Sequence, residues 1–253
     1  MKKQTTIKKW VATLSLMALW VSLSACASTE WREEVLLHDG GRIIVDRAVE
    51  RGGRHEAGQK PPYSEQSLTF THPVTNQIVK WEDKFSEDIG SANFLPMLLD
   101  IKNGVVYLVA YPMGCLSYNK WGRPNPPYVI FKYQSNEWQR ISLQELPAEI
   151  NTPNLIFSMP DIEVEKAGER LMSAEMIKAI TAGYRQPEYK TILREELASA
   201  GRNCAEMVYD GKGGWIGVGW FRRQPTYGSC LKYCVQESIR SQYCPCSTFF
   251  KGK

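Results

Sequence analysis

The chain has 253 residues, with 31 lysines and arginines against 27 acidic residues. Four of the lysines lie within residues 1–9, where there is no acid, so the remainder of the chain is neutral overall. A neutral chain argues against nucleic-acid binding, which needs a basic surface, and removes a general attraction to anionic lipids or acidic polymers. The roughly 228 residues after the first segment can bury the core of one larger domain or of two small ones.

Residues 1–26 have the pattern of an export signal. The four early lysines precede the uncharged apolar run 10–25, which is shorter than the roughly 20 residues that span a bilayer. The ending Leu23-Ser24-Ala25-Cys26 resembles the bacterial lipobox, whose cysteine receives a diacylglycerol and, after cleavage, an amine-linked acyl chain such as palmitate. We therefore expect residues 1–25 to be removed and Cys26 to be lipidated. The alternative is an ordinary signal cut near Ala25 or Ala27 that leaves Cys26 unmodified.

A lipidated Cys26 predicts the location of the protein. One acyl chain holds a protein only marginally at a membrane, whereas a triacylated cysteine provides stable anchoring. Ala27 and Ser28 follow Cys26, and the absence of an aspartate there favours the periplasmic face of the outer membrane. Residues 26–32 are expected to form a tether that reaches roughly 20 Å when extended, which keeps the folded domain close to the bilayer.

The next part of the chain has the residue pattern of antiparallel β hairpins. Asp39-Gly40-Gly41 and Asn103-Gly104 are strong hairpin turn signals between β-rich runs. Five pairs of runs flank such turns: 34–38 with 42–47, 67–71 with 77–82, 95–101 with 105–111, 128–133 with 138–141, and 204–209 with 215–221. This pattern predicts a protein made mainly of β structure.

Helix signals are fewer and come late in the chain. Ser173 is a favoured N-cap residue before an apolar pattern that ends near Gly183. A second helix is predicted from Pro187 to Ala200, with the proline near its start, and a weaker third one over 229–241. Because hairpins precede the helices and one hairpin follows them, the expected fold class is α+β, not repeated βαβ units.

Six cysteines besides Cys26 are candidates for disulfides, because an even number in an exported protein indicates bonded pairs. They are Cys115, Cys204, Cys230, Cys234, Cys244 and Cys246. On a helix Cys230 and Cys234 lie one turn apart, with Cβ atoms ~5–6 Å from each other. A disulfide needs ~3.5–4.5 Å, so we expect each of these two residues to bond another cysteine.

Two pairings remain if all six cysteines are bonded. In the first, Cys115 bonds Cys204 and the tail 230–253 closes on itself with two bonds. In the second, Cys115 and Cys204 each bond a cysteine of the tail, and one bond remains within the tail. The second pairing is favoured, because a short tail with few apolar residues needs tethering to the β-rich domain 33–229 to stay ordered. Each bond is expected to stabilise the fold by about 2–4 kcal/mol. Two alternatives stay open, a metal site of four thiolates with an unusual zinc spacing, and redox exchange at Cys244-Pro245-Cys246.

The chain offers no recognisable catalytic or cofactor motif. His38, His55 and His72 are its three histidines, and their spacing is not that of a metal site. His55 and Glu56 are candidates for a base and its acidic partner, although an exposed loop is the simpler interpretation. No G-x-S-x-G elbow, GxGxxG or P-loop is present. We expect no cofactor and no enzymatic activity, and an enzyme with an unrecognised site stays an alternative.

The segment 116–128 combines tyrosine, tryptophan and arginine with three prolines that stiffen the chain. Rigid aromatic residues and arginine dominate binding hot spots, and aromatic rings also stack on sugars. The candidate binding residues are Tyr118, Trp121, Arg123 and Tyr128. The alternative is that the rings fold back onto the sheet and the prolines only shape the loop.

Four stretches of the chain carry a resemblance to a known group of proteins. They are Glu-Glu-Val-Leu-Leu-His-Asp-Gly at 33–40, Arg-Gly-Gly-Arg-His-Glu at 51–56, the run Ser117–Tyr128, and the strand 215–221 with Cys230 and Cys234. Together they resemble a group of uncharacterised proteobacterial lipoproteins, over most of the chain after the signal. The resemblance implies a lipoprotein and supplies no catalytic residue.

These features favour a non-enzymatic, lipid-anchored envelope protein that binds another protein near the membrane. One version is an immunity lipoprotein that neutralises an incoming antibacterial effector protein. The alternatives are a carbohydrate- or peptidoglycan-binding module and the enzyme with an unrecognised site. The expected partners are membrane lipid, through acylated Cys26, and an envelope or effector protein, but no nucleic acid.

Overall fold

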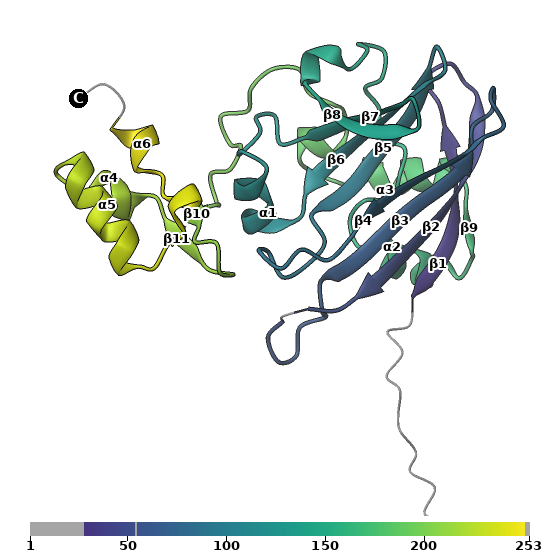
Figure 1. The fold of residues 1–253 in the computed structure, drawn as a ribbon. Helices are drawn as coiled ribbons and strands as arrows, with labels where there is room; N and C mark the ends of the chain where they lie inside the picture. Colours follow the sequence, from purple (N-terminus) through teal and green to yellow (C-terminus); the bar gives the residue numbers. More distant parts are fainter. Residues whose placement is uncertain (1–27, 54, 251–253) are drawn as a thin grey trace, which may run out of the picture.

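The computed structural model describes residues 28–53 and 55–250, so Cys26 and the signal segment lie outside the described residues. The first of its two main sheets has the strand order β4-β3-β2-β1-β9 (Figure 1). Its strands are β1 (Thr29–Leu36), β2 (Arg42–Arg51), β3 (Tyr63–Thr71), β4 (Ile78–Asp83) and β9 (Leu171–Met172). All neighbours are antiparallel except β9, which pairs with β1 in parallel.

The second main sheet has the order β5-β6-β7-β8 and is antiparallel throughout. Its strands are β5 (Phe94–Lys102), β6 (Val105–Pro112), β7 (Val129–Gln134) and β8 (Glu137–Ile141). Alternating apolar residues of both sheets meet in the central core, which includes Val35, Val45, Leu68, Leu99, Leu108 and Val129. Burial of each such side chain contributes about 1.5–3 kcal/mol, so the packing of the two sheets dominates the stability of the fold.

The outer face of the second sheet is also buried. Along β7, Val129 and Phe131 face the central core, whereas Ile130 packs on the other side against Leu146 and Ile150. The covering segments contain the short 3₁₀ turns η1 (Leu143–Glu145) and η2 (Pro187–Tyr189). This double coverage explains why β5 is apolar almost throughout its length instead of alternating.

Two helices pack against the first sheet. They are α2 (Pro160–Ala167) and α3 (Ala174–Ala182). Val164 of α2 and Ile177 of α3 join a core cluster with Trp31 of β1. The N-cap of α3 is Ser173, whose hydroxyl accepts a hydrogen bond from the Met176 amide at 3.2 Å, as the sequence predicts.

A smaller unit, which we call the C-terminal unit, comprises residues 207–250. It contains β10 (Met207–Tyr209), β11 (Trp215–Gly217), α4 (Gly219–Arg222), α5 (Tyr227–Gln236), η3 (Ser241–Tyr243) and α6 (Cys246–Phe249). Its small core consists of Phe221, Cys230, Cys234, Ile239 and Cys246. The unit lies beside α1 (Gly114–Lys120), at one side of the two main sheets (Figure 1).

The predicted α+β class and the hairpins are confirmed, since each of the five predicted pairs of runs contains an antiparallel pair. The last pair is shorter than the predicted 204–209 with 215–221, because only 207–209 and 215–217 pair and Gly219–Arg222 form α4. The helix predicted for Pro187 to Ala200 is wrong, because only η2 forms there. The backbone amide of Ile192 donates to Asn151 O, and Arg194 donates to carbonyl groups of the 143–150 segment. These tertiary contacts hold the chain in an irregular path in spite of its helical pattern.

Two of the predicted segment boundaries differ from those in the structure. The expected tether 26–32 overlaps β1, which begins at Thr29 because Trp31 is buried in the core and its strand pairs with β2 as far as Val49. The expected tail 230–253 is part of a larger unit that begins at Met207, since Val208 and Ile216 pack against the core of that unit. Within residues 28–53 and 55–250, no helix combines the length and apolar character needed to cross a membrane.

Candidate functional site

The segment predicted as a binding loop turns inward. Tyr118 and Tyr128 are buried, and the Tyr128 hydroxyl lies 2.9 Å from Glu188 O and 3.2 Å from Thr191 O. Burial raises the pKa of Tyr128 to about 12, which keeps the phenol neutral in this position. Neither ring is available to a partner at the surface, so the prediction is wrong for these two residues.

Trp121 and Arg123 also make internal contacts. Trp121 packs against Phe94 with ring centroids 4.6 Å apart, and its indole nitrogen donates to Asn93 Oδ1 at 3.2 Å. The Arg123 guanidinium lies over the Tyr118 ring and donates to Ala205 O at 3.3 Å. Trp121 therefore folds back onto the sheet, which is the alternative that the sequence left open, and Arg123 joins the chain before the C-terminal unit to the body of the protein.

Gly201 shows how close this junction is. Its φ of +65° is unfavourable for other residues, and a Cβ there would lie 2.5 Å from the Tyr118 ring and 2.9 Å from an Arg123 nitrogen. The packing of the loop on this glycine could not be inferred from the spacing of aromatic residues along the chain.

All six candidate cysteines within the described part of the chain form disulfides, but in the pairing that was not favoured. Cys115 bonds Cys204, and the C-terminal unit closes on itself through Cys230–Cys246 and Cys234–Cys244. The argument that the tail needs two bonds to the body is wrong, because β10 and β11 add a core and the unit attaches through other contacts. The expectation that Cys230 and Cys234 do not bond each other is confirmed.

The attachment of the C-terminal unit to the body is made of hydrogen bonds as well as a disulfide. The Trp215 indole donates to Asp88 O at 2.6 Å, and the Met207 amide donates to Asn119 Oδ1 at 3.0 Å. The bond between Cys115 and Cys204 fixes the chain just before this contact. The unit is therefore held in one orientation rather than attached by a free linker.

The surface of α5 carries an exposed apolar stripe. Tyr227, Leu231 and Val235 follow one another at intervals of four residues and are 48%, 40% and 77% exposed, so they share one helix face. The neighbouring helix α4 adds Trp220, which is half exposed, with the Arg223 guanidinium 4.3 Å from its ring centroid. Tryptophan, tyrosine and arginine are the residues that concentrate binding energy in protein interfaces.

Charge is divided unevenly between the body and the C-terminal unit. Residues 207–250 contain five lysines and arginines against two acids, whereas residues 26–206 contain 20 against 25. Among the basic residues, Arg223 follows α4 and Lys232 is next to Leu231 in α5. The chain after the signal is neutral overall, but the C-terminal unit has a net positive charge. A positive surface favours an acidic binding partner over a neutral one.

A second feature is a cavity of about 420 Å³ between the ends of β1 and β5 and the helix α3. His38 and Asp100 lie in its wall, with His38 Nδ1 2.7 Å from Asp100 Oδ1. Asp100 is buried, and it also accepts hydrogen bonds from the amides of His38 and Ile101. These contacts place the proton on Nδ1 and leave Nε2 as the ring nitrogen open to a ligand.

The other two histidines do not form comparable sites. His72 is buried and accepts from the amides of Val74 and Thr75, which makes it part of a turn. His55 is exposed in the loop after β2, and its Nδ1 lies 3.0 Å from Gly53 O. The structure does not bring His55 and Glu56 into a cavity. His38 was missed because its partner Asp100 lies 62 residues away in the chain.

No family model, curated protein or solved structure matches this chain.

Proposed function

We propose that this protein is a lipoprotein anchored through Cys26 at the periplasmic side of the envelope, where it binds an acidic protein partner through its C-terminal unit. The observation that carries the proposal is the exposed stripe Tyr227, Leu231 and Val235 on a basic unit stapled by two disulfides. Such a unit loses little conformational freedom on binding, because its backbone is already ordered.

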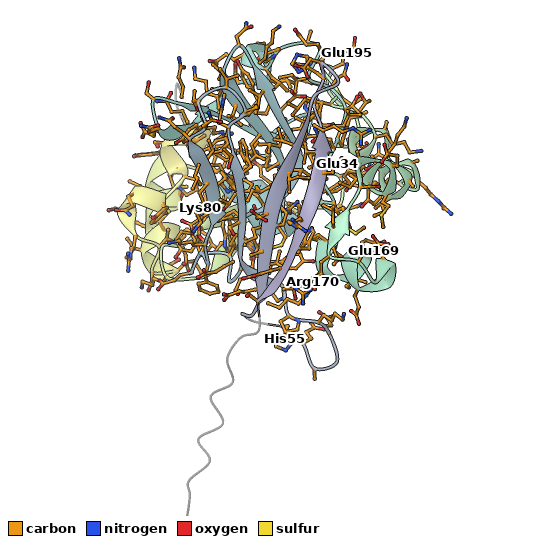
Figure 2. The ribbon with its side chains drawn as sticks, turned by 90° about the vertical axis from the view of Figure 1, so that its right-hand side faces the viewer. Glu34, His55, Lys80, Glu169, Arg170 and Glu195 are labelled. Carbon is orange, nitrogen blue, oxygen red and sulfur yellow. A yellow bond between two sulfur atoms is a disulfide. The ribbon has the colours of Figure 1, made fainter. Side chains whose placement is uncertain are left out.

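The position of the unit is compatible with an anchored protein. β1 begins at Thr29, three residues after Cys26, which corresponds to about 10 Å of extended chain. Figure 2 shows Arg170 and His55 at the end of the molecule where β1 begins, and Arg170 donates to Glu30 O. The C-terminal unit lies at the side of the main sheets, not at this end (Figure 1), so an anchored molecule would leave the stripe accessible.

The test is site-specific crosslinking in living cells. A photo-crosslinking residue replaces Val235 in the full-length tagged lipoprotein, and the same residue replaces Ile78 as a control. Ile78 is 72% exposed on β4, in the body, so it samples the same compartment without touching the unit. We expect one acidic protein to be captured at Val235 and not at Ile78, and Leu231→Ser to lower the yield.

Other outcomes separate the competing functions. Equal capture of many proteins at both positions would argue against a specific site on the C-terminal unit. Capture of glycan fragments in place of protein would favour a peptidoglycan-binding module. If the partner is an antibacterial effector, deletion of the gene should lower survival against sibling cells, as expected for the immunity version of the function.

A second candidate function is hydrolysis, which the cavity with His38 and Asp100 favours. A carboxylate that holds the imidazole by Nδ1 prepares Nε2 to take a proton from water or from an alcohol. The full-length protein should then hydrolyse p-nitrophenyl acetate faster than the variants His38→Gln and Asp100→Asn do. His55→Gln is the control, because His55 is exposed and does not line the cavity. Equal rates in all four proteins would remove this candidate.

A further inference from the structure

The two disulfides of the C-terminal unit lie side by side, because three of their four sulfur atoms form one cluster and the fourth, that of Cys230, is bonded to it. Cys246 Sγ, which bonds Cys230, lies 3.6 Å from Cys234 Sγ and 3.4 Å from Cys244 Sγ. Cys244 and Cys234 are bonded to each other. The sulfur atoms of Cys234, Cys244 and Cys246 all lie within 4.8 Å of one another. Two independent bridges do not require such an arrangement.

The distances in this cluster are close to those of a tetrahedral metal site. With a Zn–S bond of ~2.3 Å, the sulfur atoms of a tetrahedral tetrathiolate are roughly 3.8 Å apart. The two distances between the bridges, 3.4 and 3.6 Å, already approach that value. After reduction, the sulfur atoms within each former bridge would need to separate by roughly 2 Å to reach the spacing of a zinc tetrathiolate. Cys230 Sγ, which lies outside the group of three close sulfur atoms, would also need to approach Cys234 and Cys244 by side-chain rotation.

The surroundings of the cluster also suit a metal centre. Cys230, Cys234 and Cys246 are buried, and Cys244 is half-buried. Cys230 and Cys234 are presented by one face of α5, and Cys246 begins α6. Phe221 and Ile239 pack around the sulfur atoms, so water is largely excluded. A shielded group of thiolates of this kind is the ligand set that zinc prefers.

We propose that Cys230, Cys234, Cys244 and Cys246 form a two-state site, with two disulfides in the oxidised protein and a zinc tetrathiolate in the reduced protein. To load the site, two molecules of a dithiol reductant transfer four electrons to the two disulfides and become disulfides themselves. The four cysteine thiols then bind Zn²⁺ as thiolates and release four protons. Oxidation by a disulfide oxidant runs in the opposite direction, reforms both bridges and releases the ion.

The consequence is that the C-terminal unit keeps its fold in both redox states. Its core is small and includes cysteines, so reduction without a metal would remove the bonds that hold α5 and α6 together. Zinc would replace them, as it does in small domains whose folding depends on the ion. The proposal does not depend on the protein-binding function, because it concerns the interior of the unit and not its exposed stripe.

The test uses the full-length protein, reduced by a phosphine and then mixed with Zn²⁺. Free metal is removed by gel filtration, and the bound zinc is measured by mass spectrometry. We expect a single zinc ion per chain in the reduced protein and none in the oxidised protein. Co²⁺ in place of Zn²⁺ should produce the visible absorption of a tetrahedral thiolate site. Loss of all zinc during gel filtration of the reduced wild-type protein would overturn the proposal.

Variants locate the site. Cys115→Ala with Cys204→Ala removes the two cysteines of the body and should leave the single zinc ion in place. Cys230→Ser with Cys246→Ser removes half of the ligands and should abolish retention of zinc and the cobalt absorption. Zinc that is retained equally by this second variant must bind elsewhere and would also overturn the proposal. Because the main measurement is made on the wild-type chain, a folding defect of the variant cannot decide the result.

Discussion

Glu33 of β1 and Arg47 of β2 form an ion pair in the interior of the first sheet. Both are almost completely buried, and Glu33 Oε1 accepts from Arg47 Nη1 at 3.0 Å and from the Trp31 indole at 2.7 Å. Burial raises the pKa of Glu33 despite these partners. Among the described residues, Arg47 Nε is the buried side-chain atom that has no hydrogen-bond partner. The ion pair and its hydrogen bonds therefore do not fully offset the cost of removing two charges from water.

Removing one member of this pair should destabilise the protein strongly. Arg47→Met leaves the Glu33 carboxylate buried without its cation, and we expect the free energy of unfolding to fall by about 3–5 kcal/mol. Urea denaturation followed by circular dichroism measures this change. The matched control is the double variant Glu33→Leu with Arg47→Met, which buries no charge and should lose much less. Equal losses in both variants would show that packing, not charge, determines the effect.

Asp161 at the start of α2 makes the stability depend on acid pH. Burial acts to raise its pKa, but hydrogen bonds from Arg51 Nε at 2.7 Å and from the Tyr63 hydroxyl outweigh it, so the pKa is lowered from 3.8. The carboxylate therefore contributes stability above about pH 3.8 that is lost as the pH falls through its folded-state pKa. Asp161→Asn should reduce the fall in the free energy of unfolding between pH 5 and pH 2, measured by chemical denaturation. An unchanged slope would contradict the assignment.

At the scale of elements, the bond between Cys115 of α1 and Cys204 connects parts of the chain 89 residues apart. Closing a loop of this length stabilises a fold by about 4–5 kcal/mol in the chain-entropy model. We expect Cys115→Ala with Cys204→Ala to lower the urea midpoint accordingly and to increase proteolysis between residues 194 and 206. A midpoint equal to that of the wild-type protein would mean that contacts such as Trp215 with Asp88 suffice to hold the junction.

The elements that could be predicted from the sequence are those whose signals are local. Asn103-Gly104 sets the turn between β5 and β6, and Ser173 caps α3, because each acts within a few residues of itself. The helix predicted over 187–200 failed for the opposite reason. Its conformation depends on Arg194, which binds carbonyl groups about 45–50 residues earlier in the chain. No pattern within the segment could indicate that contact.

At the scale of the whole molecule, both candidate sites depend on residues that only the fold brings together. His38 and Asp100 meet because the end of β1 lies over the end of β5. The exposed stripe of α5 could have been found from its four-residue spacing, but only once Cys230 and Cys234 had marked the buried face. The cysteine pairing was mispredicted because the extent of the C-terminal unit, which decides it, is a property of packing rather than of local sequence.

At the scale of the whole molecule, the proposed lipid anchor at Cys26 would hold both candidate sites close to the membrane. Cys26 precedes β1 by three residues, so an acylated Cys26 would hold the main sheets about 10 Å from the bilayer. We expect the full-length protein to incorporate labelled palmitate and to sediment with membranes. Cys26→Ser should abolish the label and release the protein into the soluble periplasmic fraction, with an unchanged urea midpoint. Absence of the palmitate label from the wild-type protein, or a mature N-terminus at Ser28, would instead support the ordinary signal cut. Retention of the label in Cys26→Ser would place the lipid at another residue.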